Sequence, residues 1–219
     1  MTLLYNRADG PHNNQPLINK GAPLDQADRA IILTHGRGAD AQDILTLADE
    51  LQIDRSTTAV LAPDAKNHTW YPLSFMAPIE QNEPFLTSAL NFLGDTLKRL
   101  EENDISSEKV MMIGFSQGAC LSTEFVARNP KRYWGVAALS GGLIGPPNRD
   151  FQFEGDLNGT PIFLGCSDVD FHIPKERVQQ STIILNGMGA ETTEHLYPGM
   201  GHTINTDELR FVQDMIDAV

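Results

Sequence analysis

Short runs of apolar residues alternate with amphipathic stretches along most of the chain. Unbroken apolar runs, such as Ala30 to Leu33, are typical of strands that are buried on both faces of a parallel sheet. We expect strands at residues 29–34, 57–62, 109–113, 133–139, 161–166 and 192–197. We expect helices around 44–51, at 84–102, 117–129 and 174–189, and at 206–218 with Thr206 as its cap. This alternation predicts a mostly parallel sheet with helices on both faces.

The first 28 residues have a different pattern, rich in Asn, Pro, Gly and Asp. Their only strand-like pieces are Thr2–Tyr5 and Gln15–Asn19. This composition predicts either a short edge hairpin or an ordered arm in front of the parallel sheet.

Two long connections, at 63–84 and 140–159, interrupt the regular alternation. Connections of that length in a compact domain are usually functional. The first contains Trp70, Tyr71, Phe75 and Met76, which we expect to wall a substrate pocket, although ordinary core packing explains them equally well. Two loops can form only a small lid, which favours compact, soluble substrates over lipid aggregates.

The length of 219 residues suits one domain spanning the whole chain. Its 16 basic and 29 acidic residues give a net charge of -13, which repels polyanions and argues against nucleic acid as a partner. With no apolar run of transmembrane length and no signal-peptide core at the N-terminus, we expect a cytoplasmic protein without stable membrane insertion. Cys120 and Cys166 are predicted to be small buried residues, and their spacing gives no metal site.

The sequence Gly114-Phe115-Ser116-Gln117-Gly118 follows a predicted strand and opens a predicted helix. Gly-x-Ser-x-Gly in that setting is typical of a sharp strand-to-helix turn that presents the serine at its apex. Flanking glycines are required because a Cβ would collide with the neighbouring strand or helix. Ser116 is therefore the candidate nucleophile. The alternative is a serine that only caps the helix.

A serine nucleophile needs a base and a carboxylate, in the order Ser, Asp or Glu, His in this type of fold. His202 follows the last predicted strand in a glycine-rich loop and is the candidate base. Asp168 and Asp170 both follow the strand at 161–166, and spacing alone does not separate them. The same pair could form a cation site, but the glycine and distal Glu of a calcium loop are absent.

Acyl transfer also needs hydrogen-bond donors for the oxyanion. The residue after the nucleophile supplies one, the backbone N–H of Gln117, and the turn after an early strand supplies the other. That turn is His35-Gly36-Arg37-Gly38, with Arg37 as the expected donor. A nucleotide-binding turn is excluded because neither a third glycine nor Gly-Lys-Ser/Thr follows.

Taken together, these motifs resemble the bacterial phospholipase/carboxylesterase branch of the α/β-hydrolases, which includes acyl-protein thioesterase-like enzymes. The resemblance rests on His35–Gly38, Trp70–Pro72, Asn82–Pro84, Gly114–Ala119, Leu139–Gly142 and Pro198–His202. It implies an α/β-hydrolase fold with little or no cap domain, and a cofactor-free serine esterase acting on short-chain esters or thioesters.

The resemblance also implies which acid completes the triad. The family carries it as the second aspartate of Gly-Asp-x-Asp-Pro-x-Val-Pro, which corresponds to Asp170 when laid on Ser167–Pro174. This sequence departs from the pattern at Ser167 and Phe171, so Asp168 stays open.

The leading hypothesis is a serine hydrolase that cleaves a small ester or thioester through an acyl-enzyme on Ser116. A non-catalytic ligand-binding protein on the same fold is the alternative, and labelling by a fluorophosphonate distinguishes the two. A dienelactone-type hydrolase would carry Cys at position 116. The sequence does not identify the natural ester or its acyl-chain length, and it leaves room for a homodimer.

Overall fold

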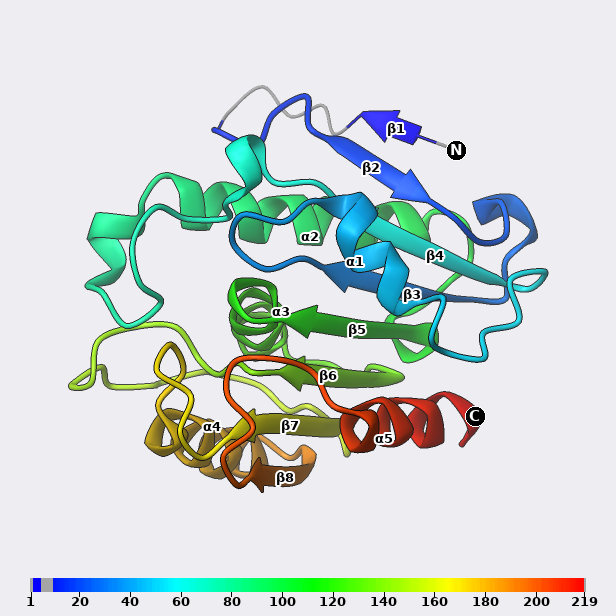
Figure 1. Ribbon diagram of the computed structural model, residues 1–219. Coiled ribbons are helices and arrows are strands. Elements are labelled where there is room, and N and C mark those ends of the chain that lie inside the picture. Colours follow the sequence, from blue (N-terminus) through cyan, green and yellow to red (C-terminus); the bar gives the residue numbers. More distant parts are fainter. Residues whose placement is uncertain (1, 5–9, 219) are drawn as a thin grey trace.

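The computed structural model describes residues 2–4 and 10–218, and these form one eight-stranded sheet in the order β1-β2-β4-β3-β5-β6-β7-β8 (Figure 1). The strands are β1 (Thr2–Leu4), β2 (Pro16–Asn19), β3 (Arg29–Thr34), β4 (Thr58–Pro63), β5 (Val110–Phe115), β6 (Gly135–Leu139), β7 (Pro161–Ser167) and β8 (Glu191–Tyr197). β3 to β8 pair in parallel, and β1 and β2 run antiparallel at one edge. The expected mostly parallel sheet is confirmed.

Helices cover both faces of this sheet (Figure 1). They are α1 (Ala41–Leu47), α2 (Phe85–Glu101), α3 (Gln117–Arg128), α4 (Lys175–Gly187) and α5 (Thr206–Asp217). Short 3₁₀ helices lie at Leu24–Gln26, Lys66–His68, Ile79–Asn82 and Ser107–Lys109. Among the described residues, no helix combines the length and apolar character needed to cross a membrane.

Alternating side chains of the central strands supply two separate cores. Ile32 of β3 joins a cluster with α2, α3 and α4, whereas its neighbours Ile31 and Leu33 join a second cluster with α1 and α5. Adjacent residues of a strand point to opposite faces, so a strand between two helical layers must be apolar on both. This explains the unbroken apolar run from Ala30 to Leu33.

The N-terminal segment forms the edge hairpin rather than a separate arm. β1 pairs antiparallel with β2, and β2 continues the sheet by pairing antiparallel with β4. Tyr5, which we expected to end the first strand, lies outside the described residues.

The cap of α5 differs from the prediction, because the helix is capped by Asn205 and not by Thr206. The Asn205 side chain accepts a hydrogen bond from the Glu208 backbone N–H at 2.9 Å, and the Glu208 carboxylate accepts one from the Asn205 N–H at 2.9 Å. This reciprocal capping box needs Glu or Gln at the third helical position. Counting back from Glu208 gives Asn205.

Glu208 is fully buried, and its Oε1 has no hydrogen-bond partner among the described residues. Burial raises the pKa of this carboxyl from 4.5 to about 7. The folded state therefore binds a proton that the unfolded chain releases, and stability should fall as the pH rises from 4.5 to 7. Glu208→Gln should remove this loss, on the order of 3 kcal/mol.

Urea unfolding of both proteins at pH 5 and pH 8 tests this prediction. We expect Glu208→Gln to gain stability relative to the wild type at pH 8 and to show little difference at pH 5. An equal effect of the substitution at both pH values would contradict it.

Candidate active site

Ser116 lies at the turn between β5 and α3, with φ 55° and ψ -118°. At the neighbouring glycines, Gly114 and Gly118, there is no space for a side chain. An added Cβ at Gly118 would lie 2.1 Å from the Thr34 carbonyl oxygen, and one at Gly114 would lie 2.6 Å from the Ala119 backbone nitrogen. The backbone thus packs too tightly against β3 and α3 for any residue but glycine, which holds the serine in a sparsely populated conformation.

His202 connects Ser116 to a carboxylate. The Ser116 hydroxyl lies 2.8 Å from His202 Nε2, and His202 Nδ1 lies 2.6 Å from Asp170 Oδ2. Since a carboxylate only accepts, Nδ1–H donates to Asp170 and Nε2 is left to accept the serine proton. The three side chains come from the loops after β5, β7 and β8, at the carboxyl ends of the strands.

Asp170 is buried, and its second oxygen accepts hydrogen bonds from the backbone N–H groups of His172 at 2.8 Å and Ile173 at 3.0 Å. Burial acts to raise the pKa of this carboxyl, but the hydrogen bonds from His202, His172 and Ile173 outweigh it and lower the pKa below 3.8. The resulting stabilisation is present above the ordinary pKa and is lost as the pH falls through the lowered value.

Asp168 has a different position from Asp170. Its carboxylate accepts a hydrogen bond from the Gly199 backbone N–H at 2.8 Å, and the neighbouring Ser167 hydroxyl accepts one from the Gly201 N–H at 3.0 Å. Both side chains therefore hold the loop that carries His202. Sequence reasoning missed this role of Ser167, although the departure from the family pattern at that position was a signal for it.

The two expected oxyanion donors lie on either side of the nucleophile. Gln117 is the first residue of α3, where backbone N–H groups have no acceptor within the helix. Arg37 follows Gly36, at which an added Cβ would lie 3.4 Å from the Ser116 Cβ. The turn after β3 therefore passes directly beside Ser116.

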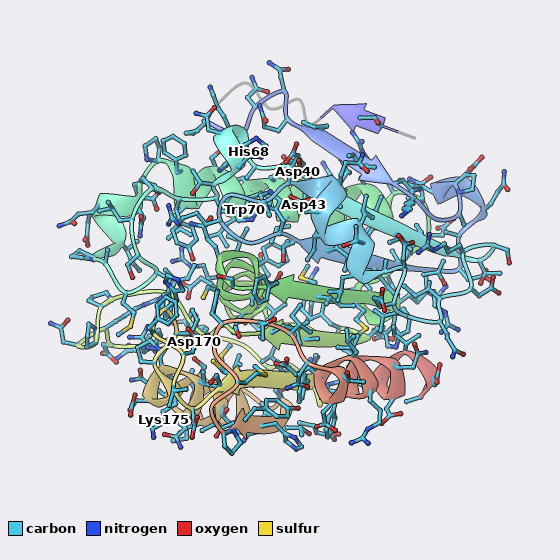
Figure 2. All side chains as sticks on the ribbon, viewed as in Figure 1. Asp40, Asp43, His68, Trp70, Asp170 and Lys175 are labelled. Atoms are coloured by element: carbon cyan, nitrogen blue, oxygen red, sulfur yellow. The ribbon has the colours of Figure 1, made fainter. Side chains whose placement is uncertain are left out.

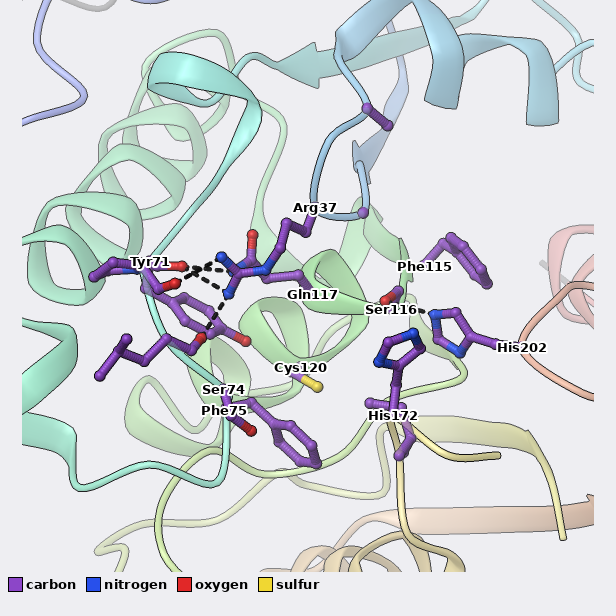
Figure 3. Close-up of a pocket in the computed structure, with 15 residues that line it drawn as sticks. Arg37, Tyr71, Ser74, Phe75, Phe115, Ser116, Gln117, Cys120, His172 and His202 are labelled. Atoms are coloured by element: carbon purple, nitrogen blue, oxygen red, sulfur yellow. Dashed lines mark hydrogen bonds between the residues drawn. The ribbon is translucent and has the colours of Figure 1, made fainter. Parts of the chain in front are cut away.

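The side chains of both residues hold the loop at 69–73 (Figure 3). Gln117 Oε1 accepts from the Trp70 N–H at 2.8 Å, and Gln117 Nε2 donates to the Tyr71 carbonyl at 2.8 Å. The Arg37 guanidinium donates to the carbonyls of Tyr71, Pro72 and Leu73 at 2.9, 2.8 and 2.5 Å. Each expected oxyanion donor is thus fixed through its own side chain, a connection that no sequence motif indicates.

His35 orients the peptide that precedes Arg37. Its Nε2 accepts from the Ala65 N–H at 3.0 Å, so Nδ1 carries the proton and donates to the Gly36 carbonyl at 2.8 Å. Burial lowers the pKa of this imidazole, which keeps it neutral and able to make both bonds. The Gly36 carbonyl and the Arg37 N–H point in opposite directions within one trans peptide unit, so a carbonyl aimed at the His35 ring turns the Arg37 N–H away from that ring.

Replacing Gln117 with leucine should loosen this arrangement. The Trp70 N–H would lose its partner in a buried site, while the Tyr71 carbonyl would keep the hydrogen bond from Arg37. The free energy of unfolding should therefore fall by about 1–3 kcal/mol. Thermal unfolding measures the loss. The exposed Gln179→Leu is the matched control and should change little; equal stability of the two variants would contradict the prediction.

A cavity of about 450 Å³ opens beside Ser116 (Figure 3). Its lining consists of Gly36, Arg37, Ala39, Tyr71, Pro72, Leu73, Ser74, Phe75, Phe115, Ser116, Gln117, Cys120, His172, Ile173 and His202. Tyr71 and Phe75 are thus among the wall residues that we expected. Within residues 2–4 and 10–218, no group of His, Cys, Asp or Glu side chains could hold a metal ion.

The other two expected wall residues, Trp70 and Met76, lie outside this cavity. Trp70 is fully buried; its Nε1–H donates to the His35 carbonyl at 2.9 Å, and its ring packs on the His35 ring. Trp70 and Asp170 lie toward the same end of the sheet (Figure 2), and Trp70 packs against His35 at the start of the turn after β3. Met76 faces a separate hollow beside Arg149 and Phe151.

Comparisons with known proteins give one family. Residues 16–219 match the model described as Phospholipase/Carboxylesterase. Acyl-protein thioesterase 1 of Debaryomyces hansenii is 31% identical over 93% of this chain and 97% of its own length. A phospholipase/carboxylesterase from Dyadobacter fermentans is 42% identical, with a TM-score of 0.87 over 91% of this chain and 95% of the other. The Bacillus cereus carboxylesterase shares the fold at 18% identity, with a TM-score of 0.72 over 93% and 94% of the two chains.

Proposed function

Because the chain belongs to the phospholipase/carboxylesterase family of α/β-hydrolases, we propose that it hydrolyses short-chain carboxylic esters or thioesters through an acyl-enzyme formed on Ser116. The family resemblance drawn from the sequence motifs is confirmed, and the chain is a carboxylesterase-type hydrolase. The observation that carries the proposal is the unbroken hydrogen-bond chain from Ser116 through His202 to Asp170.

The reaction begins with attack of the Ser116 oxygen on the carbonyl carbon. His202 Nε2, 2.8 Å from this oxygen, takes its proton and becomes an imidazolium. Asp170, 2.6 Å from Nδ1, fixes the tautomer and stabilises that cation. His202 then protonates the departing oxygen or sulfur. A water molecule hydrolyses the acyl-enzyme with the same groups acting in reverse.

The backbone N–H groups of Arg37 and Gln117 hold the negative oxygen of each tetrahedral intermediate. Loss of one such donor typically costs about 2.7–4 kcal/mol of transition-state stabilisation. The contacts of the two side chains with residues 69–73, together with the His35 bond to Gly36, support pre-organised donors. Such groups do not need to reorganise during the reaction.

The proposal is tested first by a fluorophosphonate probe and an ester panel of increasing acyl length. A hydrolase of this kind should form a covalent adduct on Ser116 and release acid from the shorter esters. A ligand-binding protein on the same fold would do neither, and that result would exclude the proposed activity.

A further inference from the structure

The Tyr71 hydroxyl is a polar group that the mechanism above does not use. Tyr71 is 1% exposed, and its side chain lines the cavity beside Ser116. Among the described residues its hydroxyl makes no hydrogen bond of normal geometry; the Cys120 thiol, a weak hydrogen-bonding group, is close enough to act on the pKa of the phenol. Buried polar groups almost always have a partner, since an unpaired one costs free energy, so an orphaned hydroxyl in a cavity wall indicates a missing hydrogen-bonding molecule.

The position of the neighbouring Cys120 indicates how far from Ser116 the Tyr71 hydroxyl lies. Cys120, which also lines the cavity, makes a weak side-chain contact with the Tyr71 hydroxyl and helps to raise the pKa of the phenol. The Cys120 N–H donates to the Ser116 carbonyl at 3.0 Å, so Cys120 lies one helical turn beyond the nucleophile. One turn corresponds to a rise of about 5 Å. The Tyr71 hydroxyl therefore lies near the far end of a short group attached to Ser116.

The position of the Tyr71 hydroxyl relative to His202 indicates which part of the substrate it contacts. His202 delivers the proton to the leaving group, so the leaving group departs on the His202 side of Ser116. Figure 3 shows Tyr71, Cys120 and Phe75 on the other side of Ser116 from His202. The wall that carries the phenol thus contacts the acyl group.

The buried wall on this side leaves the phenol as its distinctive polar group. Phe75 supplies apolar surface, and the Cys120 thiol is a weak hydrogen-bonding group. Ser74 is exposed, and its hydroxyl already accepts a hydrogen bond from the Met76 N–H at 3.2 Å. Burial raises the pKa of the Tyr71 phenol well above its ordinary value, so the group stays protonated and able to donate.

On the basis of the proposed function, we propose that Tyr71 forms a polar acyl subsite, which selects short acyl groups that carry an ether, keto or hydroxyl oxygen at their far end. An oxygen there accepts the phenol hydrogen bond, whereas a purely alkyl group leaves the phenol unpaired. A site built to pair with a polar atom discriminates strongly against an analogue that lacks it.

The test compares two p-nitrophenyl esters of the same length, the pentanoate and the 3-methoxypropanoate, in which an oxygen replaces one methylene. The quantity measured is the ratio of their kcat/KM values in the wild type and in Tyr71→Phe. The intrinsic reactivity of each ester cancels in this comparison. We expect Tyr71→Phe to lower the preference for the methoxy ester about tenfold or more. An unchanged ratio would overturn the proposal.

Tyr133→Phe is the matched control. The Tyr133 hydroxyl donates to the Asn129 carbonyl at 2.8 Å and lies outside the cavity. This variant should lose thermal stability and keep the wild-type ester ratio. Tyr71→Phe should keep its stability, because its hydroxyl has only the weak contact with the Cys120 thiol to lose. A destabilised Tyr71→Phe with an unchanged ratio would assign the phenol a structural role.

A binding measurement separates this proposal from the proposed function. Calorimetry on Ser116→Ala, with pentanamide and 3-methoxypropanamide as ligands, does not depend on turnover. Tighter binding of the methoxy amide, lost on adding Tyr71→Phe, supports the polar subsite even if no ester is hydrolysed. Equal binding of the two amides contradicts the subsite even if ester hydrolysis is established.

Discussion

Ser116→Ala is expected to lower the kcat/KM for p-nitrophenyl butyrate by about four to six orders of magnitude. The substitution removes the proposed nucleophilic oxygen, while the hydrogen bond between His202 and Asp170 and the turn after β3 stay in place. A single hydroxyl at the surface of the cavity contributes little to stability. The thermal unfolding midpoint should therefore stay close to that of the wild type, and fluorophosphonate labelling should disappear.

Ser106→Ala provides the control for this experiment. Ser106 is exposed and precedes β5, so it lies at the opposite end of the same strand from Ser116. This variant should keep both labelling and turnover. Retained turnover in a folded Ser116→Ala protein would refute Ser116 as the nucleophile.

The position of Ser116 could be predicted because its determinants are local. An unbroken apolar run specifies β5 between two helical layers, and Gly114 and Gly118 permit a turn in which any Cβ would collide. His202 could be predicted from chain order, since the carboxyl ends of parallel strands converge at one edge. Neither prediction needed any knowledge of side-chain direction.

The packing of the loop aromatics depends on side-chain direction, which the sequence reasoning left open. Trp70 and Tyr71 are adjacent aromatic residues, yet one packs against His35 at the turn after β3 and the other lines the cavity. The loop conformation that separates them is fixed by Arg37 and Gln117, which are distant in sequence. The cap of α5 is one residue from the prediction because two adjacent residues, Asn205 and Thr206, both have suitable side chains.

These distant contacts give the loop at 69–73 a double role. Its backbone accepts and donates the hydrogen bonds that fix Arg37 and Gln117, and its Tyr71 side chain lines the cavity at the proposed acyl subsite. Changes in this loop should therefore alter acyl preference and turnover together. Substitutions confined to the Tyr71 phenol, which makes none of the backbone contacts, should alter acyl preference alone.

The choice between the two aspartates gives the second large expected effect. Asp170→Asn should lower kcat/KM for p-nitrophenyl butyrate by about three to four orders of magnitude. The negative charge that stabilises the imidazolium is lost, and an amide that donates to Nδ1 would favour the wrong tautomer of His202. The amide oxygen of the new side chain can still accept hydrogen bonds from the backbone N–H groups of His172 and Ile173, so the fold should survive.

Asp168→Asn is the matched control, since it makes the same chemical change two residues away. The asparagine oxygen can still accept from the Gly199 N–H, so the His202 loop stays in place and the loss should be less than about tenfold. Steady-state kinetics on both variants, with thermal unfolding as the check on folding, decide between them. A larger loss at Asp168 than at Asp170 would reverse the assignment. It would mean that the contact by which Asp168 holds the His202 loop, rather than the hydrogen bond to Nδ1, limits the action of His202.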